Sequence, residues 1–261
     1  MRLTVGTFNI RNLNDRYDER WPLLAAAFAA FAPDVAALQE VSFDDQRQDD
    51  MLAAAVPLHT YRGFIARSPR HPAFGNAILV RTGDAMGKQE LRLEPGRVAH
   101  RVLLLLEGQI TVWVVNTHLH HRRQEPAVRA AQAQALARWM EDAPAADATV
   151  IAGDFNAPPE EPACQVMRTS GYRSAFAEAN GTEPAFTWPS GIQSPTMDTD
   201  GDPACVDYLW IRGRVAAVRA WLACNEPSPP TPRSSPATTS PSPRSSKSAD
   251  FPGSSTPFAL R

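Results

Sequence analysis

Five short apolar segments of this chain begin or end in polar side chains, and this repeated pattern limits the folds that it can adopt. Each segment has the length and composition of a strand, and its polar residue stands at one end. Strand ends are where a rigid sheet presents side chains to a ligand. The five positions are Asn9, Glu40, His118, Asp154 and Asp207.

Helical patterns separate these segments. Residues 18–31 place Trp21, Leu24 and Phe28 at helical spacing, and Pro126 suits the first turn of a helix over 126–141. Many strands with helices between them predict packed sheets covered by helices. We expect further helices at 44–55 and 160–169, and strands at 3–9, 35–41, 76–81, 101–107, 110–116, 149–152, 206–211 and 214–223.

The polar residue types point to one kind of chemistry. Carboxylate and amide oxygens suit a hard cation such as Mg²⁺, with Mn²⁺ as a substitute. A histidine and amides suit the oxygens of a phosphoryl group, so the combination indicates metal-assisted cleavage of a phosphate ester. Each residue alone has an ordinary structural explanation, such as a turn, a solvated strand end or a salt bridge. The repetition of strand and polar residue favours a shared site.

Composition excludes several classes of protein. The formal net charge of −2 argues against a strongly basic nucleic-acid binder, although a local groove can still be basic. Three widely spaced cysteines fit neither a disulfide framework nor a zinc ribbon. No apolar run is long enough for a membrane span, and the first residues do not resemble a signal peptide. We therefore expect a cytoplasmic protein, and the sequence leaves its oligomeric state open.

Six motifs, in order, resemble the endonuclease/exonuclease/phosphatase superfamily over residues 1–224. Any one of them is weak, but the set is specific. The superfamily includes deoxyribonucleases, abasic-site endonucleases, sphingomyelinases and inositol-polyphosphate phosphatases. The motifs are T-F-N-I (7–10), L-Q-E-V (38–41), G-N-A-I-L-V (75–80), N-T-H-L (116–119), G-D-F-N (153–156) and V-D-Y-L-W-I (206–211).

The resemblance implies an α/β fold, a four-layer sandwich of two mixed β-sheets face to face with helices outside. It also implies roles for the polar residues. Glu40 would be the main Mg²⁺ ligand with Asn9 beside it, and Asp154 would orient or deprotonate the attacking water. Asn156 and His118 would hydrogen-bond the phosphate oxygens. By the same resemblance, Asp207 would orient a catalytic histidine near the C-terminus, and Asn76 would support the site.

His118, His120 and His121 together could suggest zinc. No acid or cysteine follows them at the spacing of a zinc site, so we do not expect one. We interpret His120 and His121 as surface residues near the phosphate.

The C-terminal region departs from the superfamily pattern, which ends in Ser-Asp-His and an apolar strand. Residues 225–261 contain nine prolines and ten serines, and no histidine follows His121. This composition predicts a disordered tail without a final strand. A shifted reading frame can encode Ser-Asp-His, an apolar strand and a stop in this region, so we favour a one-base insertion or deletion near codons 226–230. A natural Pro/Ser-rich tail is the alternative.

The leading interpretation is a Mg²⁺-dependent phosphoesterase by resemblance. We expect the chain as written to be poorly soluble and nearly inactive, because general acid–base catalysis contributes ~10²–10⁴ in rate and the histidine is missing. A non-catalytic phosphate-binding protein is the main alternative, and a scaffold acting through the proline-rich tail is a third. Arginines that follow the N-T-H-L motif, such as Arg122 and Arg123, could face a phosphate backbone or solvent. The substrate is a phosphate ester, and nucleic acid remains among the candidates.

Overall fold

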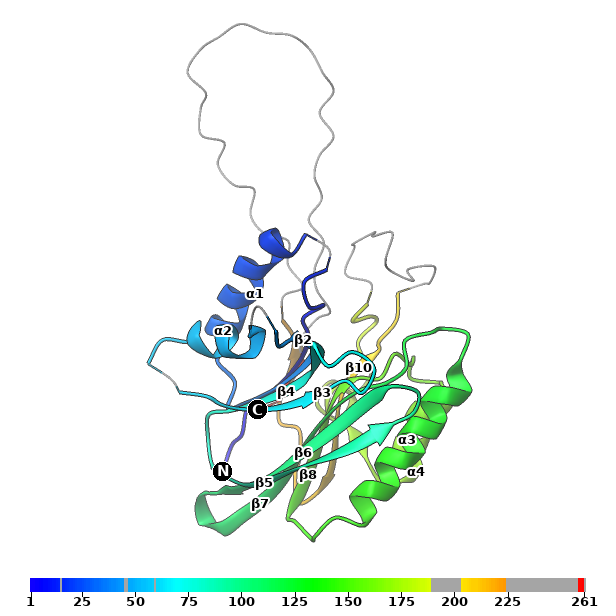
Figure 1. Cartoon of the computed structure of the whole chain (residues 1–261). Coiled ribbons are helices and arrows are strands. Elements are labelled where there is room, and N and C mark those ends of the chain that lie inside the picture. The colour runs from blue at the N-terminus through cyan, green and yellow to red at the C-terminus, as the bar shows by residue number, and fades with distance from the viewer. Residues whose placement is uncertain (15, 45–46, 59, 189–202, 224–257, 261) are drawn as a thin grey trace, which may run out of the picture.

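Two six-stranded β-sheets pack face to face in the computed structural model, with helices on their outer faces (Figure 1). The structure describes residues 1–14, 16–44, 47–58, 60–188, 203–223 and 258–260. The predicted four-layer α/β sandwich is therefore confirmed.

The first sheet is mixed, because β1 and β2 are parallel and its other neighbours are antiparallel. The apolar residues of β1 and β2 are buried on both faces, as expected for central strands. The strands in spatial order are β11 (Ala220–Leu222), β12 (Phe258–Leu260), β1 (Val5–Asn9), β2 (Val35–Ser42), β4 (Phe74–Val80) and β3 (Arg62–Arg67).

The second sheet is also mixed, with β7 and β8 parallel and the other neighbours antiparallel. The strands in spatial order are β5 (Asp84–Leu93), β6 (Arg97–Leu106), β7 (Ile110–His118), β8 (Ala148–Asp154), β10 (Asp207–Gly213) and β9 (Arg173–Ser174). Each sheet thus contains one central parallel pair, and the carboxyl ends of both pairs carry predicted site residues.

The helices lie outside the sheets (Figure 1). Leu24 and Phe28 of α1 are buried against Phe8 of the first sheet. The α3 helix begins at Pro126, as predicted, and buries Leu136 and Met140. None of the described helices is long and apolar enough to span a membrane. The helices are α1 (Tyr17–Phe31), α2 (Gln48–Ala54), α3 (Pro126–Glu141), α4 (Pro162–Thr169) and α5 (Ala175–Asn180), with a 3₁₀ turn at Glu107–Gln109.

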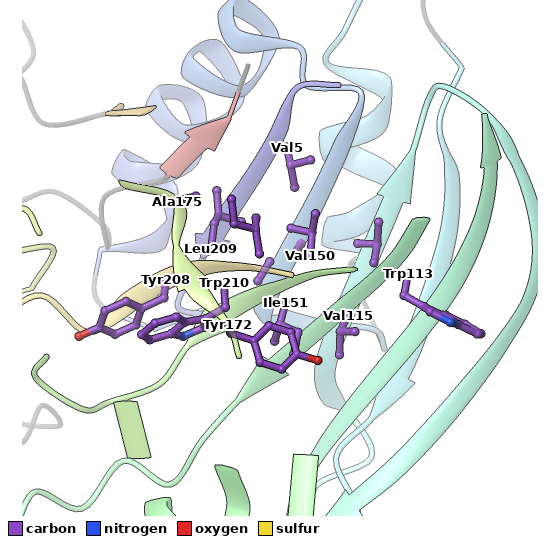
Figure 2. Close-up of a cluster of buried hydrophobic side chains, with 14 of the residues drawn as sticks. Val5, Trp113, Val115, Val150, Ile151, Tyr172, Ala175, Tyr208, Leu209 and Trp210 are labelled. Carbon is purple, nitrogen blue, oxygen red and sulfur yellow. The ribbon is translucent and has the colours of Figure 1, made fainter. Parts of the chain in front are cut away.

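The main hydrophobic core fills the space between the sheets. Figure 2 shows Val5 of the first sheet together with Val115, Val150 and Leu209 of the second. All four side chains are buried. Burial of this apolar area supplies the main driving force for the two sheets to pack.

Amide side chains also connect the two sheets. Asn116 of β7 is fully buried, and its Nδ2 donates to the carbonyl oxygens of Leu38 on β2 and Ala77 on β4, both at 2.8 Å. Gln39 Nε2 donates to Asn116 Oδ1 at 2.8 Å, and Asn76 Nδ2 donates to the Val98 carbonyl of β6 at 2.9 Å. Buried amides cost free energy unless they are paired, so these bonds fix how one sheet sits on the other.

The sequence did not predict three strands, β3, β5 and β9, or the short helix α5. β5 is an edge strand whose side chains are mostly exposed, so it has no apolar run to reveal it. The strand expected over 214–223 is limited to Ala220–Leu222, and the helix expected from residue 44 begins at Gln48.

The prediction that the chain lacks a final strand is wrong. The backbone of β12 pairs antiparallel with both β1 and β11, opposite Val5–Thr7 and Ala220–Leu222. This extended tripeptide fills the position between them and supplies the ladder hydrogen bonds that the edge of β1 would otherwise lack. The rest of the predicted tail, 225–257 and 261, lies outside the described residues.

Candidate active site

Five of the six predicted site residues line one cavity of about 360 Å³. Asn9 and Glu40 come from the parallel pair of the first sheet, and His118 and Asp154 from the parallel pair of the second. Asn156 follows β8. Parallel strands present their carboxyl ends at the same sheet edge, and the packed sheets bring the two edges together. The sixth residue, Asp207, is buried on β10 as the cross-strand partner of Asp154.

The Asn9 amide bridges the two carboxylates of the cavity. Its Nδ2 donates to Glu40 Oε1 and to Asp154 Oδ2, both at 3.0 Å, and its Oδ1 accepts from the backbone N–H of Arg11 at 3.0 Å. Asn12 Nδ2 also donates to Glu40 Oε2 at 3.3 Å. Two acidic groups therefore meet at one amide at the edge of an open cavity.

This donor set fits a hard divalent cation. Within the described ranges, no three His, Cys, Asp or Glu side chains gather into a full metal cage. Mg²⁺ is usually held by only one or two carboxylates together with water and substrate phosphate. The Glu40 carboxylate and the amide oxygen of Asn9 are the groups that would hold such an ion.

A β-bulge directs Glu40 into the cavity. The pairing of β2 with β4 shifts register between Leu38 and Val41, and Glu40 has a φ of 54°. A left-handed conformation is strained for a non-glycine residue and often occurs at functional sites. Three other residues that line the cavity share this feature, namely Arg11, Asn12 and Asn156.

Asp154 is buried beside the bridge. Its Oδ1 accepts the backbone N–H of Asn156 at 2.8 Å, while its Oδ2 accepts from Asn9. Burial raises the pKa of the Asp154 carboxyl to about 6, and the charge of Glu40 adds to the effect. A carboxylate with such a pKa can accept a proton from water near neutral pH.

Asp207 is 1% exposed and lies beside Asp154. Its backbone N–H donates to Thr187 Oγ1 at 3.2 Å, and its Oδ2 has no hydrogen-bond partner among the described residues. Burial raises the pKa of Asp207 well above its ordinary value, and the charge of Asp154 raises it further. A buried carboxyl oxygen without a hydrogen-bond partner costs free energy, because it has lost its bonds to water and gained none in return.

The sequence did not single out Arg97, which also lines the cavity. Its guanidinium contacts His118 and His121. Arg97 begins an apolar strand after a Pro-Gly turn, so the rule of polar residues at strand ends could have found it. The prediction of a surface position is wrong for His120, which is 7% exposed and has its Nε2 2.8 Å from Glu125 Oε2. His121 is exposed and lines the cavity, as expected.

Comparison with known proteins agrees with this geometry. The sequence profile of the endonuclease/exonuclease/phosphatase family matches residues 6–229. Comparison with curated proteins gives no match.

Several solved structures share the fold. A family protein from Bacteroides vulgatus has 17% identity and a TM-score of 0.71, over 100% of this chain and 98% of that one. Truncated TDP2 from Caenorhabditis elegans has 18% identity and a TM-score of 0.70, with the same coverage. A mannosyl-6-phosphatase from Bacteroides thetaiotaomicron has 16% identity and a TM-score of 0.69, over 99% of this chain and 98% of that one. At these identities the likeness concerns the fold alone.

Proposed function

Because the chain belongs to the endonuclease/exonuclease/phosphatase family, we propose that it hydrolyses phosphate esters with the help of Mg²⁺ or Mn²⁺. The observation that carries the proposal is the Asn9 bridge between Glu40 and Asp154 in a cavity that also holds His118 and Asn156. The carboxylates suit a cation, and the hydrogen-bond donors suit a phosphoryl group bound beside it.

The proposed roles follow from each environment. Glu40 and Asn9 hold the metal ion, which when bound polarises a phosphoryl oxygen and neutralises its charge. Asp154 orients the attacking water and accepts its proton, in keeping with its raised pKa. Asn156 and His118 donate hydrogen bonds to the phosphoryl oxygens, where negative charge grows during the reaction.

The cavity leaves the size of the substrate open. Its volume of about 360 Å³ accommodates a phosphoryl group together with at least part of the group to which it is esterified. A structural relative is a mannosyl-6-phosphatase, which is consistent with a phosphomonoester substrate, and nucleic acid stays a candidate alongside it. A cytoplasmic location also stays a prediction, in line with the two free thiols of Cys164 and Cys205.

The test is hydrolysis of 4-nitrophenyl phosphate and bis(4-nitrophenyl) phosphate with Mg²⁺, with Mn²⁺ and with EDTA. We expect metal-stimulated turnover that Glu40→Gln lowers by ~10² or more, because it removes one charged ligand at nearly constant volume. Glu141→Gln, an exposed residue at the end of α3, is the matched control. Turnover that persists in EDTA, or that Glu40→Gln leaves intact, would contradict the proposal.

A non-catalytic phosphate-binding protein is the second candidate. Two observations favour it: the sequence has no histidine after His121, and the buried Oδ2 of Asp207 has no hydrogen-bond partner in the described part of the chain. Phosphate binding without turnover under all metal conditions would support this candidate. A second chain carrying the shifted frame, with Ser-Asp-His and its strand, should then regain hydrolysis if the reading-frame hypothesis is right.

A further inference from the structure

Arg97 lies between two imidazole rings at the edge of the cavity. Its Nη1 is 3.1 Å from His118 Nδ1, and its Nη2 is 3.1 Å from His121 Nδ1. Arg97 begins β6, His118 ends β7, and His121 follows three residues later. Two nitrogens of one guanidinium therefore contact the Nδ1 atoms of two different histidines.

This contact determines which ring nitrogens carry protons. A guanidinium offers five N–H donors and no acceptor, and it stays charged in proteins. Both Nδ1 atoms must therefore accept through a lone pair, which leaves each ring neutral with its proton on Nε2. Burial lowers the pKa of His118, and partial shielding from water lowers that of His121. The charge of Arg97 lowers both pKa values further, so the neutral forms are favoured.

The loop that carries His121 is anchored rather than loose. Gln132 Oε1 accepts the backbone N–H of His120 at 2.8 Å, and Gln132 Nε2 donates to the Glu94 carbonyl at 3.0 Å. One buried side chain thus ties the histidine loop to the turn just before Arg97. Gln132 therefore holds the segment that carries Arg97 beside the loop that carries His121.

We propose that Arg97 is a positioning residue that fixes His118 and His121 as a pair of neutral Nε2–H donors, and that His121 donates to the bound phosphoryl group together with His118 and Asn156. The proposal rests on the proposed function, because it assigns the phosphoryl group to this wall of the cavity. His118 Nε2 is 3.7 Å from Asp154 Oδ2, beyond hydrogen-bond length. Its proton can thus reach a phosphoryl oxygen.

The arrangement also divides the chemical work. A neutral imidazole with its proton on Nε2 and its Nδ1 occupied by Arg97 has no free lone pair for a proton from water. His118 and His121 therefore act as donors, and proton acceptance falls to Asp154. The positive charge of Arg97 interacts with the charges of Glu40 and Asp154, which line the same cavity, so groups that suit an anion and groups that suit a cation share one site.

The first experiment reads the tautomers directly in the metal-free wild-type chain. Long-range ¹H–¹⁵N NMR spectra at pH 7 distinguish a protonated from an unprotonated ring nitrogen, and His118→Asn and His121→Asn assign the signals. We expect an unprotonated Nδ1 and a protonated Nε2 in both rings. A protonated Nδ1 in either ring would overturn the proposal, and the tautomers themselves are read in the wild-type chain.

The second experiment titrates inorganic phosphate into EDTA-treated protein by calorimetry. We expect Arg97→Gln and His121→Asn each to weaken phosphate binding about tenfold or more, since each disturbs a charge-assisted or oriented donor. Arg92→Gln on the neighbouring strand makes the same charge change at an exposed site and should leave binding unchanged. Equal weakening by Arg92→Gln, or none by Arg97→Gln, would overturn the proposal.

Neither experiment needs turnover, so the two proposals fail separately. A chain with the expected tautomers and phosphate affinity but without metal-stimulated hydrolysis refutes only the proposed function. A chain that hydrolyses esters but keeps its phosphate affinity after Arg97→Gln refutes only the role of Arg97 and His121.

Discussion

One buried guanidinium ties the histidine loop to α3 and to the start of α4. Arg129 of α3 is fully buried, and its Nε and Nη2 donate to the two carboxylate oxygens of Glu161 at 2.9 and 2.7 Å. Its Nη1 donates to the Arg122 carbonyl at 2.6 Å, and its Nη2 to the Arg123 carbonyl at 3.2 Å. We therefore predict that Arg129→Met strongly destabilises the fold.

The expected loss follows from what the substitution leaves behind. Removing one partner of a buried ion pair costs about 3–5 kcal/mol, because the other charge stays buried and unpaired. The Glu161 side chain is 18% exposed, so water can solvate part of its charge in the variant. We therefore expect a loss of unfolding free energy near the lower end of this range, at about 3 kcal/mol. Removing both charges in Arg129→Met/Glu161→Met should recover part of this loss.

The measurement is the free energy of unfolding from urea titration. Arg173→Met is the control, since its ion pair with Glu178 is largely exposed and should contribute at most about 1 kcal/mol. A cost for Arg129→Met no greater than that of the control would refute the reasoning. So would a double variant that is less stable than the single one.

Two further predictions concern stability away from the loop. His100 is fully buried, and burial lowers its pKa to about 3 from an ordinary 6.5. The unfolded chain therefore binds a proton first as the pH falls, and we expect His100 to account for a loss of stability on the order of 3 kcal/mol between pH 8 and pH 4, measured as the difference between the drop in the wild-type chain and the smaller drop in His100→Gln. Gly153→Ala would place a Cβ 2.0 Å from the Thr117 carbonyl oxygen. The melting temperature of this variant should therefore fall sharply below that of the wild-type chain. Gly108→Ala, which meets open space, should shift the melting temperature much less, and equal shifts would contradict the steric argument.

The sequence predicted the central strands well because each is marked by a short apolar run of its own residues. Buried runs such as 150–152 are apolar throughout, and Pro126 marks the start of its helix. The edge strand β5 escaped prediction because solvent, not core, meets most of its side chains. Its place is set by pairing with β6, which is a tertiary contact.

The site was predictable in its residue types but not in its connections. The polar strand ends identified the residues that line the cavity, and the family motifs supplied their order. The bulge that turns Glu40 into the cavity depends on the register between β2 and β4. This register is a long-range property that the residues around Glu40 do not reveal in the sequence. Arg97 meets His118 and His121 only because the turn before β6 folds back beside the end of β7.

The buried amide of Asn116 has a consequence for how the protein loses its site. Asn9 and Glu40 belong to one sheet and His118 and Asp154 to the other, while Asn116 bonds to β2 and β4 across the interface. A sliding motion of one sheet over the other would break these bonds before it separated Asn9 and Glu40 from His118 and Asp154. The amide therefore couples the alignment of the two halves to global unfolding, and the site should persist intact until the whole sandwich opens.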